Sequence, residues 1–185
     1  LTIQATHPDG RPVSTICFVS GGFGALQGQD GRDCLPGPSN MAAVPVEVWE
    51  TITGMTVVSK RLTPDSGGPG AFRGGVGQEI VLRNDTGQPM TVLSMGNRTD
   101  FAPPGYLGGR SGGLRGHRIN GETIHPKGAH PLAPGDEIAL VQAGGGGIGD
   151  PENRAADAIA RDIALGFVTP EGAARDYGFG PADDD

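Results

Sequence analysis

Glycine constrains this chain more than any other residue type, because 34 of its 185 residues are glycine, far above a typical share of about 7%. The glycines are gathered in clusters such as Gly21–Gly24, Asp65–Gly75 and Gly144–Gly149, without the three-residue period of collagen. Apolar alternating runs separate the clusters, which argues against a disordered chain. Since glycine reaches positive φ without penalty, we expect a β-rich domain with many tight turns and bulges.

Alternating apolar residues predict most of the secondary structure. Strands are expected over residues 1–6, 13–20, 76–83, 90–95 and 137–143, with hairpin turns at 7–11 and, within 118–124, at Asn120–Gly121. The range 46–62 fits either two strands joined near Gly54 or a short helix followed by a strand, and its residues 51–58 favour strand. Residues 21–40 and 125–131 have the composition of loops.

The periodicity becomes helical near the C-terminus. We expect one helix over residues 151–165, capped by Asp150, and a second short helix from Thr169 to about Tyr177. The predicted fold class is therefore α+β and mainly β. It comprises a glycine-rich β-sandwich or barrel-like region over residues 1–150 and a pair of short helices over 151–185, at the end of the same domain.

Charge and composition exclude several classes of protein. A formal net charge of −7 without a dense basic patch argues against a nucleic-acid partner. The chain has no apolar run long enough to cross a bilayer and no signal-peptide pattern, so a cytoplasmic protein is expected. Cys17 and Cys34 form no metal or redox motif and are expected to be reduced. The first residue is Leu1, which indicates either processing or a fragment of a longer polypeptide.

Two patterns resemble ligand sites, but neither meets the structural requirements for one. Gly144–Gly149 matches the dinucleotide-binding pattern G-x-G-x-x-G, yet no second parallel strand follows the predicted helix. A structural turn is the preferred interpretation, with anion binding at the helix start as the alternative. His125 and His130 have a spacing that zinc sites use, but no cysteine or carboxylate completes a ligand set nearby. We therefore expect no metal or cofactor to be bound by this chain. We also expect His117, between Gly116 and Arg118, to be exposed.

Two residues stand out as candidates for chemistry. Glu47 would share a strand face with Trp49, and an adjacent aromatic ring is one means of raising a carboxyl pKa for acid–base work. The alternative is an ordinary solvated face. Arg98 precedes a loop that two prolines make rigid, where it could bind a carboxylate or a phosphate with both guanidinium arms. The alternative is a local ion pair with Asp100.

Four segments, taken together and in order, resemble the hydantoinase B/oxoprolinase family, which includes subunits of acetone and acetophenone carboxylases. The segments are GGFG at 21–24 with NMAAVPVEVWE at 40–50, DSGGPGAFRGGVGQ at 65–78, NR at 97–98 with PPGYLGG at 103–109, and GGGGIGDP at 144–151 with the RD, GFVTPE and RDYG motifs that follow it. The second segment is the most specific. This sequence departs from the family at residues 96–100, where many relatives have a run of arginines.

The resemblance implies an activity and partners. Members of the family are usually longer, and these motifs belong to their C-terminal part. The resemblance implies ATP-dependent opening of a cyclic amide such as N-methylhydantoin or 5-oxoproline. The expected partners are a longer hydantoinase B-like chain and an ATP-binding hydantoinase A-like subunit, with ATP and a divalent metal bound elsewhere in the complex. A ketone carboxylase subunit and a non-catalytic scaffold subunit are the alternatives. Glu47, Asp65 and Arg98 are the predicted site residues.

Overall fold

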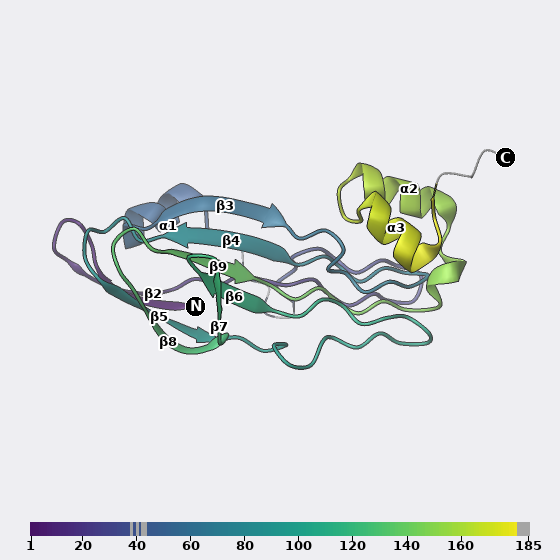
Figure 1. Ribbon diagram of the computed structural model, residues 1–185, viewed down its shortest axis with the longest axis horizontal. Coiled ribbons are helices and arrows are strands. Elements are labelled where there is room, and N and C mark those ends of the chain that lie inside the picture. Colours follow the sequence, from purple (N-terminus) through teal and green to yellow (C-terminus); the bar gives the residue numbers. More distant parts are fainter. Residues whose placement is uncertain (38, 40, 42–43, 181–185) are drawn as a thin grey trace.

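Two antiparallel β-sheets and three short α-helices make up the chain in a computed structural model, which describes residues 1–37, 39, 41 and 44–180 (Figure 1). The first sheet has the strand order β2-β1-β5-β8, and the second has the order β3-β4-β9-β6-β7. The strands are β1 (Thr2–Thr6), β2 (Pro12–Ile16), β3 (Thr56–Leu62), β4 (Gln78–Arg83), β5 (Met90–Met95), β6 (Gly116–Ile119), β7 (Glu122–Ile124), β8 (Lys127–Leu132) and β9 (Glu137–Val141). The helices are α1 (Val46–Thr53), the 3-10 helix η1 (Pro151–Asn153), α2 (Ala156–Ala164) and α3 (Pro170–Tyr177).

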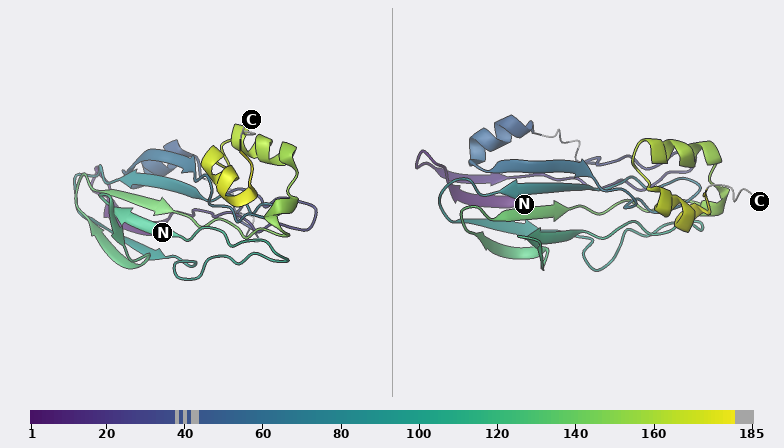
Figure 2. Two further views of the ribbon diagram at one scale, coloured as in Figure 1. Left: turned by 45° about the vertical axis from the view of Figure 1, so that its right-hand side comes forward. Right: turned by 45° about the horizontal axis from the view of Figure 1, so that its top comes forward.

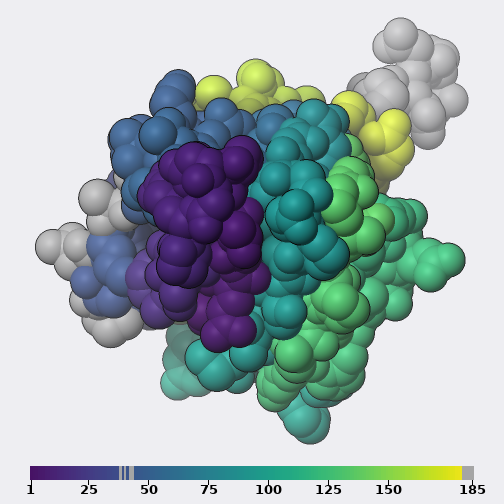
Figure 3. All heavy atoms as spheres, turned by 90° about the vertical axis from the view of Figure 1, so that its left-hand side faces the viewer, coloured from purple at the N-terminus to yellow at the C-terminus, as the bar shows by residue number. Residues whose placement is uncertain are grey.

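The hydrophobic core lies between the two sheets and under α1. Its buried members are Ile3, Trp49, Met55, Ile80, Leu82, Met90, Val92, Leu132, Ile138 and Leu140. Strands β4 and β5 are consecutive in the chain, yet they belong to different sheets, so the loop between them joins the two layers. In the described residues the sheets stay separate and do not close into a barrel. Figure 3 shows the end of the molecule where purple β1 and β2 lie beside teal β5 and green β8. The prediction of a mainly β fold with a C-terminal pair of short helices is confirmed.

Local turn chemistry is predicted well. Asn120 and Gly121 both have positive φ, at 50° and 85°, as a type I′ turn between β6 and β7 requires. The first hairpin closes through a hydrogen bond of 2.9 Å from the His7 amide to the Arg11 carbonyl. The loop predicted at 125–131 is wrong, because most of it forms β8, which pairs with β5 over residues 127–132.

Residues 46–53 form a helix, so the preference for strand over residues 51–58 is wrong for 51–53. Trp49 and Thr53 are four residues apart and point to the same buried face, which is the helical period. Gly54 ends the helix with a φ of 72° and donates to the Glu50 carbonyl at 2.8 Å. Burial of this face outweighs the β propensity of the threonines and valines.

The glycine clusters form a bundle of long segments that continues beyond both sheets toward α2 and α3 (Figure 1). We call it the glycine bundle; its segments are residues 21–34, 66–77, 103–113 and 143–149. Amide donors in one segment reach carbonyls in the next, as in Gly75 to Phe23 at 2.8 Å and Gly145 to Gly75 at 2.9 Å. A Cβ atom on Gly74 would overlap the carbonyl oxygen of Gly145, and one on Gly144 would overlap that of Ser66. The absence of a side chain is therefore what allows these backbones to touch.

The C-terminal helices lie against the far end of the glycine bundle from α1, as Figure 1 and the right-hand view in Figure 2 show. The single helix predicted over 151–165 is divided, because Arg154 and Ala155 have extended backbone between η1 and α2. Asp150 does cap η1, accepting from the Glu152 amide at 3.0 Å. The second helix begins as predicted, where the Thr169 hydroxyl accepts from the Gly172 amide at 2.9 Å. None of the helices in the described ranges is long and apolar enough to cross a membrane.

Candidate functional site

The three predicted site residues do not converge. Glu47 lies on the exposed side of α1, and Asp65 lies at the start of α3, at the opposite end of the molecule. Because residues 46–53 are helical, Glu47 and Trp49 are two positions apart on a helix and do not share a face. Trp49 is buried and Glu47 is exposed, so the expected pairing of this carboxylate with the ring is wrong, while a catalytic role for Glu47 stays a prediction.

Asp65 holds the second C-terminal helix in place. Its two carboxylate oxygens accept from the Thr169 amide at 2.9 Å and from the Thr169 hydroxyl at 2.7 Å. Its backbone has a φ of 58°, which is uncommon for a residue other than glycine, and its amide donates to the Phe167 carbonyl at 3.0 Å. These contacts connect the DSGG motif with the VTPEG motif, and they give Asp65 a positioning function for α3.

Arg98 is exposed in a glycine-lined groove. Its side chain and those of Asn97 and Arg115 lie beside backbone from three segments of the glycine bundle, and the groove has a volume of about 470 Å³. The groove is lined by Gly21, Gly22, Phe23, Gly24, Leu35, Gly37, Asn97, Arg98, Pro103, Pro104, Arg115 and Ala143–Gly146. Asp100, the predicted local partner, accepts instead from the Thr99 hydroxyl at 2.9 Å. In the described part of the chain, Arg98 forms no ion pair.

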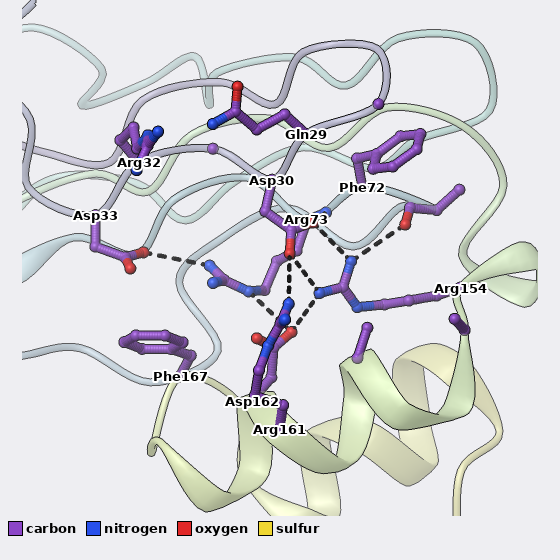
Figure 4. A pocket seen from close by; sticks show the side chains of 15 residues that line it. Gln29, Asp30, Arg32, Asp33, Phe72, Arg73, Arg154, Arg161, Asp162 and Phe167 are labelled. Atoms are coloured by element: carbon purple, nitrogen blue, oxygen red, sulfur yellow. Dashed lines mark hydrogen bonds and ion pairs between the residues drawn. The ribbon is translucent and has the colours of Figure 1, made fainter.

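A second cavity lies between the glycine bundle and α2, with a volume of about 510 Å³ (Figure 4). Its walls carry a cluster of charged side chains, which we call the Asp162 cluster: the buried Arg73, Arg154 and Asp162 and the half-buried Asp30 and Asp33. Asp162 is at its centre and accepts from Arg154 at 2.6 Å and from Arg73 at 3.2 Å. Arg154 also binds both carboxylate oxygens of Asp30, at 2.8 and 2.9 Å.

Electrostatic complementarity favours the ionised forms of Arg154 and Asp30. Burial disfavours the charged form of Arg154, but Asp30 and Asp162 outweigh it and raise the Arg154 pKa above its ordinary value. Burial likewise acts to raise the pKa of Asp30, yet hydrogen bonds and charge from Arg154 and Arg73 hold that pKa below its ordinary value. The Arg73 guanidinium also lies 4.9 Å from the centre of the Phe167 ring. The ion pairs between arginines and aspartates, together with the contact between Arg73 and Phe167, attach α2 and α3 to the glycine bundle.

The Asp162 cluster was not among the predicted site residues. Arg73 and Asp162 do occur inside two of the motifs that carry the family resemblance, so a signal was present in the sequence. Their pairing was not visible, because 89 positions separate them along the chain and 124 separate Arg154 from Asp30.

His117 is buried, with 3% of its surface exposed, so the expectation of an exposed histidine is wrong. Its Nδ1 lies 2.6 Å from the Gly116 carbonyl, which requires a proton on Nδ1, and Nε2 then accepts from the Ser94 hydroxyl at 2.9 Å. Burial, with a smaller contribution from the Arg115 charge, lowers the His117 pKa to about 4, against the opposing effect of the Gly116 carbonyl. The histidine is therefore a neutral, satisfied core residue near pH 7.

The glycine run at 144–149 uses its amides inside the bundle. Gly145 donates to the Gly75 carbonyl at 2.9 Å, Gly147 to Arg110 at 3.0 Å and Gly149 to Tyr106 at 3.0 Å. These bonds favour the structural interpretation of the G-x-G-x-x-G pattern over anion binding at the start of η1. Among the described residues, no group of three or more histidine, cysteine, aspartate or glutamate side chains has the geometry of a metal site.

Comparison with known proteins places these features in a family. The model of the hydantoinase B/oxoprolinase family matches residues 1–151. The chain is 30% identical over 176 residues to the beta subunit of the caprolactamase of Pseudomonas jessenii, which covers 88% of this chain and 30% of that protein. It is 28% identical over 172 residues to the B subunit of a putative D-/L-hydantoinase of a Pseudomonas species, covering 87% and 28%. Identity to the acetone carboxylase alpha subunit of Xanthobacter autotrophicus is 29% over 161 residues, covering 83% and 19%.

Solved structures have the same fold. The crystal structure of the ATP-dependent caprolactamase from Pseudomonas jessenii superposes with a TM-score of 0.82 at 23% identity, covering all of this chain and 34% of that one. The nucleotide-free structure of acetone carboxylase superposes with a TM-score of 0.70 at 21% identity, covering 96% and 29%. The chain thus spans less than a third of each of these curated relatives. Together with the family match over most of the sequence, these likenesses show that the chain belongs to the hydantoinase B/oxoprolinase family.

Proposed function

We propose that this chain is the C-terminal segment, or a small subunit, of an ATP-dependent cyclic-amide hydrolase of the N-methylhydantoinase or 5-oxoprolinase type. The observation that carries the proposal is the family match over residues 1–151, with the caprolactamase beta subunit as a relative over 88% of the chain. A longer hydantoinase B-like chain and an ATP-binding hydantoinase A-like subunit would act with it. ATP and a divalent metal are assigned to those other parts of the complex.

The proposed chemistry explains why ATP is consumed. An amide carbonyl resists attack by water because nitrogen donates electron density into it. Transfer of the terminal phosphoryl group of ATP to the amide oxygen makes that oxygen a leaving group. One water then adds to the carbon and the C–N bond breaks, which leaves an acyl phosphate. A second water hydrolyses the acyl phosphate, so that a cyclic amide, ATP and two waters give the ring-opened acid, ADP and phosphate.

In this assembly the glycine bundle would act as a rigid rod. Its segments hydrogen-bond to one another along their length, and the Asp162 cluster fixes α2 and α3 at one end. Backbones that pack without side chains leave little freedom for rearrangement. The bundle would therefore hold the Arg98 loop at a fixed position relative to the sheets.

A ketone carboxylase is the second candidate, supported by the likeness to the acetone carboxylase alpha subunit over 83% of this chain. Phosphorylated bicarbonate and a phosphorylated enolate would then replace the phosphorylated amide. A scaffold subunit is the third candidate, supported by the structural use that the chain makes of Asp65.

Native mass spectrometry of the purified complex, with every co-purifying chain identified, is the first test. The expected result is co-purification of a longer hydantoinase B-like chain and an ATP-binding subunit. ADP release is then measured with hydantoin, N-methylhydantoin and 5-oxoproline, and separately with acetone and bicarbonate. Turnover with a cyclic amide supports the hydrolase, whereas turnover that requires bicarbonate and a ketone replaces it with the carboxylase. A monomeric chain without partners would contradict a composite enzyme.

The scaffold alternative has its own test in the same assembly. Arg98→Gln is compared with Arg175→Gln, since Arg175 is exposed on α3. If Arg98→Gln lowers cyclic-amide turnover while the complex stays intact and Arg175→Gln has no effect, this chain contributes to catalysis. Unchanged turnover in both variants supports the scaffold.

A further inference from the structure

The groove around Arg98 contains positive charge without a counter-charge. Two arginines, Arg98 and Arg115, line it together with Asn97, and no carboxylate is among its lining residues. Neither arginine forms an ion pair in the described ranges. In the Asp162 cluster, by contrast, buried arginines share three aspartates. The groove therefore carries two positive charges that the chain itself does not neutralise.

The two arginines are held beside each other by the backbone. The Arg115 amide donates to the Arg98 carbonyl at 2.8 Å, which joins the two loops directly at these residues. Arg98 has a φ of 64°, a left-handed conformation that arginine rarely adopts, so the loop holds it in a costly geometry. On the opposite side, the Gly112 amide donates to the Pro103 carbonyl at 3.0 Å and fixes the proline loop. The backbone that carries the two arginines is thus fixed before any ligand arrives.

Arg115 has an unsatisfied donor. One end of its guanidinium donates to the side-chain oxygen of Gln142, while its buried Nε has no hydrogen-bond partner. A half-buried guanidinium without a carboxylate is unfavourable, because it loses water without gaining a compensating charge. An oxyanion in the groove would supply that charge.

The size of the groove limits the ligand. A volume of about 470 Å³ is in the range of small-molecule sites, and much of the wall is glycine backbone. Asp100 and Lys127 lie around Arg98 on its other side, in a separate depression, and do not line the groove. The geometry points to a binding site for a small-molecule oxyanion, a carboxylate or a phosphoryl group, held between the guanidinium groups of Arg98 and Arg115. This inference does not depend on which reaction the assembly performs.

Calorimetric titration of the full chain, without ATP or partner subunits, tests the site. Three probes are used at constant ionic strength: inorganic phosphate, 5-oxoproline and the neutral carboxamide of 5-oxoproline. We expect saturable binding of phosphate, of 5-oxoproline or of both, and weaker binding of the carboxamide. Phosphate alone assigns the site to a phosphoryl group, and a preference for 5-oxoproline over its carboxamide assigns it to a carboxylate.

Matched variants decide whether the groove is responsible. Arg98→Gln is expected to weaken binding by about tenfold or more, because a charge-assisted hydrogen bond is lost. Arg98 is exposed, so this variant should fold. Arg115→Lys keeps the positive charge but removes the planar guanidinium, and we expect it to weaken binding less than Arg98→Gln does. Arg175→Gln removes an arginine at the other end of the molecule and should leave binding unchanged. No binding of phosphate or 5-oxoproline, or equal weakening by Arg98→Gln and Arg175→Gln, would overturn the assignment. Because no turnover is measured, this failure is distinct from failure of the proposed hydrolase.

Discussion

Replacing Asp162 with asparagine tests whether the Asp162 cluster holds the C-terminal helices on the glycine bundle. Asp162 has 2% of its side chain exposed, and the two arginines that it binds, Arg73 and Arg154, have 3% and 1% exposed. Asparagine keeps the shape and one acceptor oxygen but removes the charge. The substitution therefore leaves two buried cations with one carboxylate fewer between them.

The expected loss in the free energy of unfolding depends on the hydrogen bonds and ion pairs that each arginine keeps in the variant. Removing one partner of a buried ion pair costs about 3–5 kcal/mol when the remaining charge is uncompensated. Arg154 keeps its two bonds to Asp30, and Arg73 keeps the Gly74 carbonyl at 2.6 Å and Asp33 at 3.4 Å. The cluster also lines an open cavity, so water can reach part of it. We therefore expect the low end, about 3 kcal/mol, which corresponds to a melting temperature lower by about 6–12 °C in a chain of this size.

Urea unfolding and hydrogen exchange read out the effect. Asp157→Asn is the matched control, since Asp157 is on the same helix but exposed, and its loss from the first helical turn should cost less than about 1 kcal/mol. Asp162→Asn should also increase amide exchange in α2 and α3 before exchange rises in the sheets. If the unfolding free energies of the two variants agree within experimental error, the cluster does not hold the helices.

Three further predictions concern stability, each measured by urea unfolding. The folded-state pKa of His117 is lowered from 6.5 to about 4, so the unfolded chain binds the proton first as the pH falls. The contribution of neutral His117 to the free energy of unfolding is fully present above pH 6.5, and it should decline by on the order of 3 kcal/mol toward pH 4. The variant His117→Gln should flatten this decline, and an unchanged dependence of the unfolding free energy on pH would reject the assignment. Gly74→Ala should cost at least about 1–3 kcal/mol through overlap with the Gly145 carbonyl, whereas Gly116→Ala, with open space around its Cβ, should change stability by less than about 0.5 kcal/mol; similar effects at both glycines would contradict close packing in the bundle. Thr169→Ala removes the cap of α3 and the hydroxyl bond to Asp65, and should cost about 1–2 kcal/mol; no loss would show that the cap is dispensable.

Elements with strong local signals could be predicted from the sequence. The Asn120–Gly121 turn follows from the positive φ that both residues tolerate, and the start of α3 follows from a threonine cap before a proline. The helix at 46–53 was not preferred, because its threonines and valines favour strand locally while burial of Trp49 decides the outcome. The break at Arg154 could not be predicted, since one of the ion pairs that position this side chain is made with Asp30, 124 residues away.

The site was less predictable than the fold because it depends on which loops meet. Arg98 is singled out by its rigid loop, but its neighbour Arg115 is not, since no pattern in the sequence signals the backbone hydrogen bond that joins the two residues. Asp65 was singled out by its motif, and the structure shows that it holds a helix. A motif therefore identified residues with constrained positions, but it did not separate residues that hold the fold from residues that face a ligand.

Glycine content has two different physical causes in this chain, and separating them changes how its motifs should be interpreted. Positive φ explains only 11 of the 34 glycines, such as Gly121 and Gly166, which end or turn an element. Gly74 and Gly144 have no positive φ; they are glycine because a neighbouring backbone occupies the space of a Cβ atom. The clusters, which were expected as turns and bulges, are therefore mostly close-packed walls. A wall of this kind can hold two unpaired arginines at a fixed spacing, which is why we look for ligand chemistry at Arg98 and Arg115 and not within the glycine run.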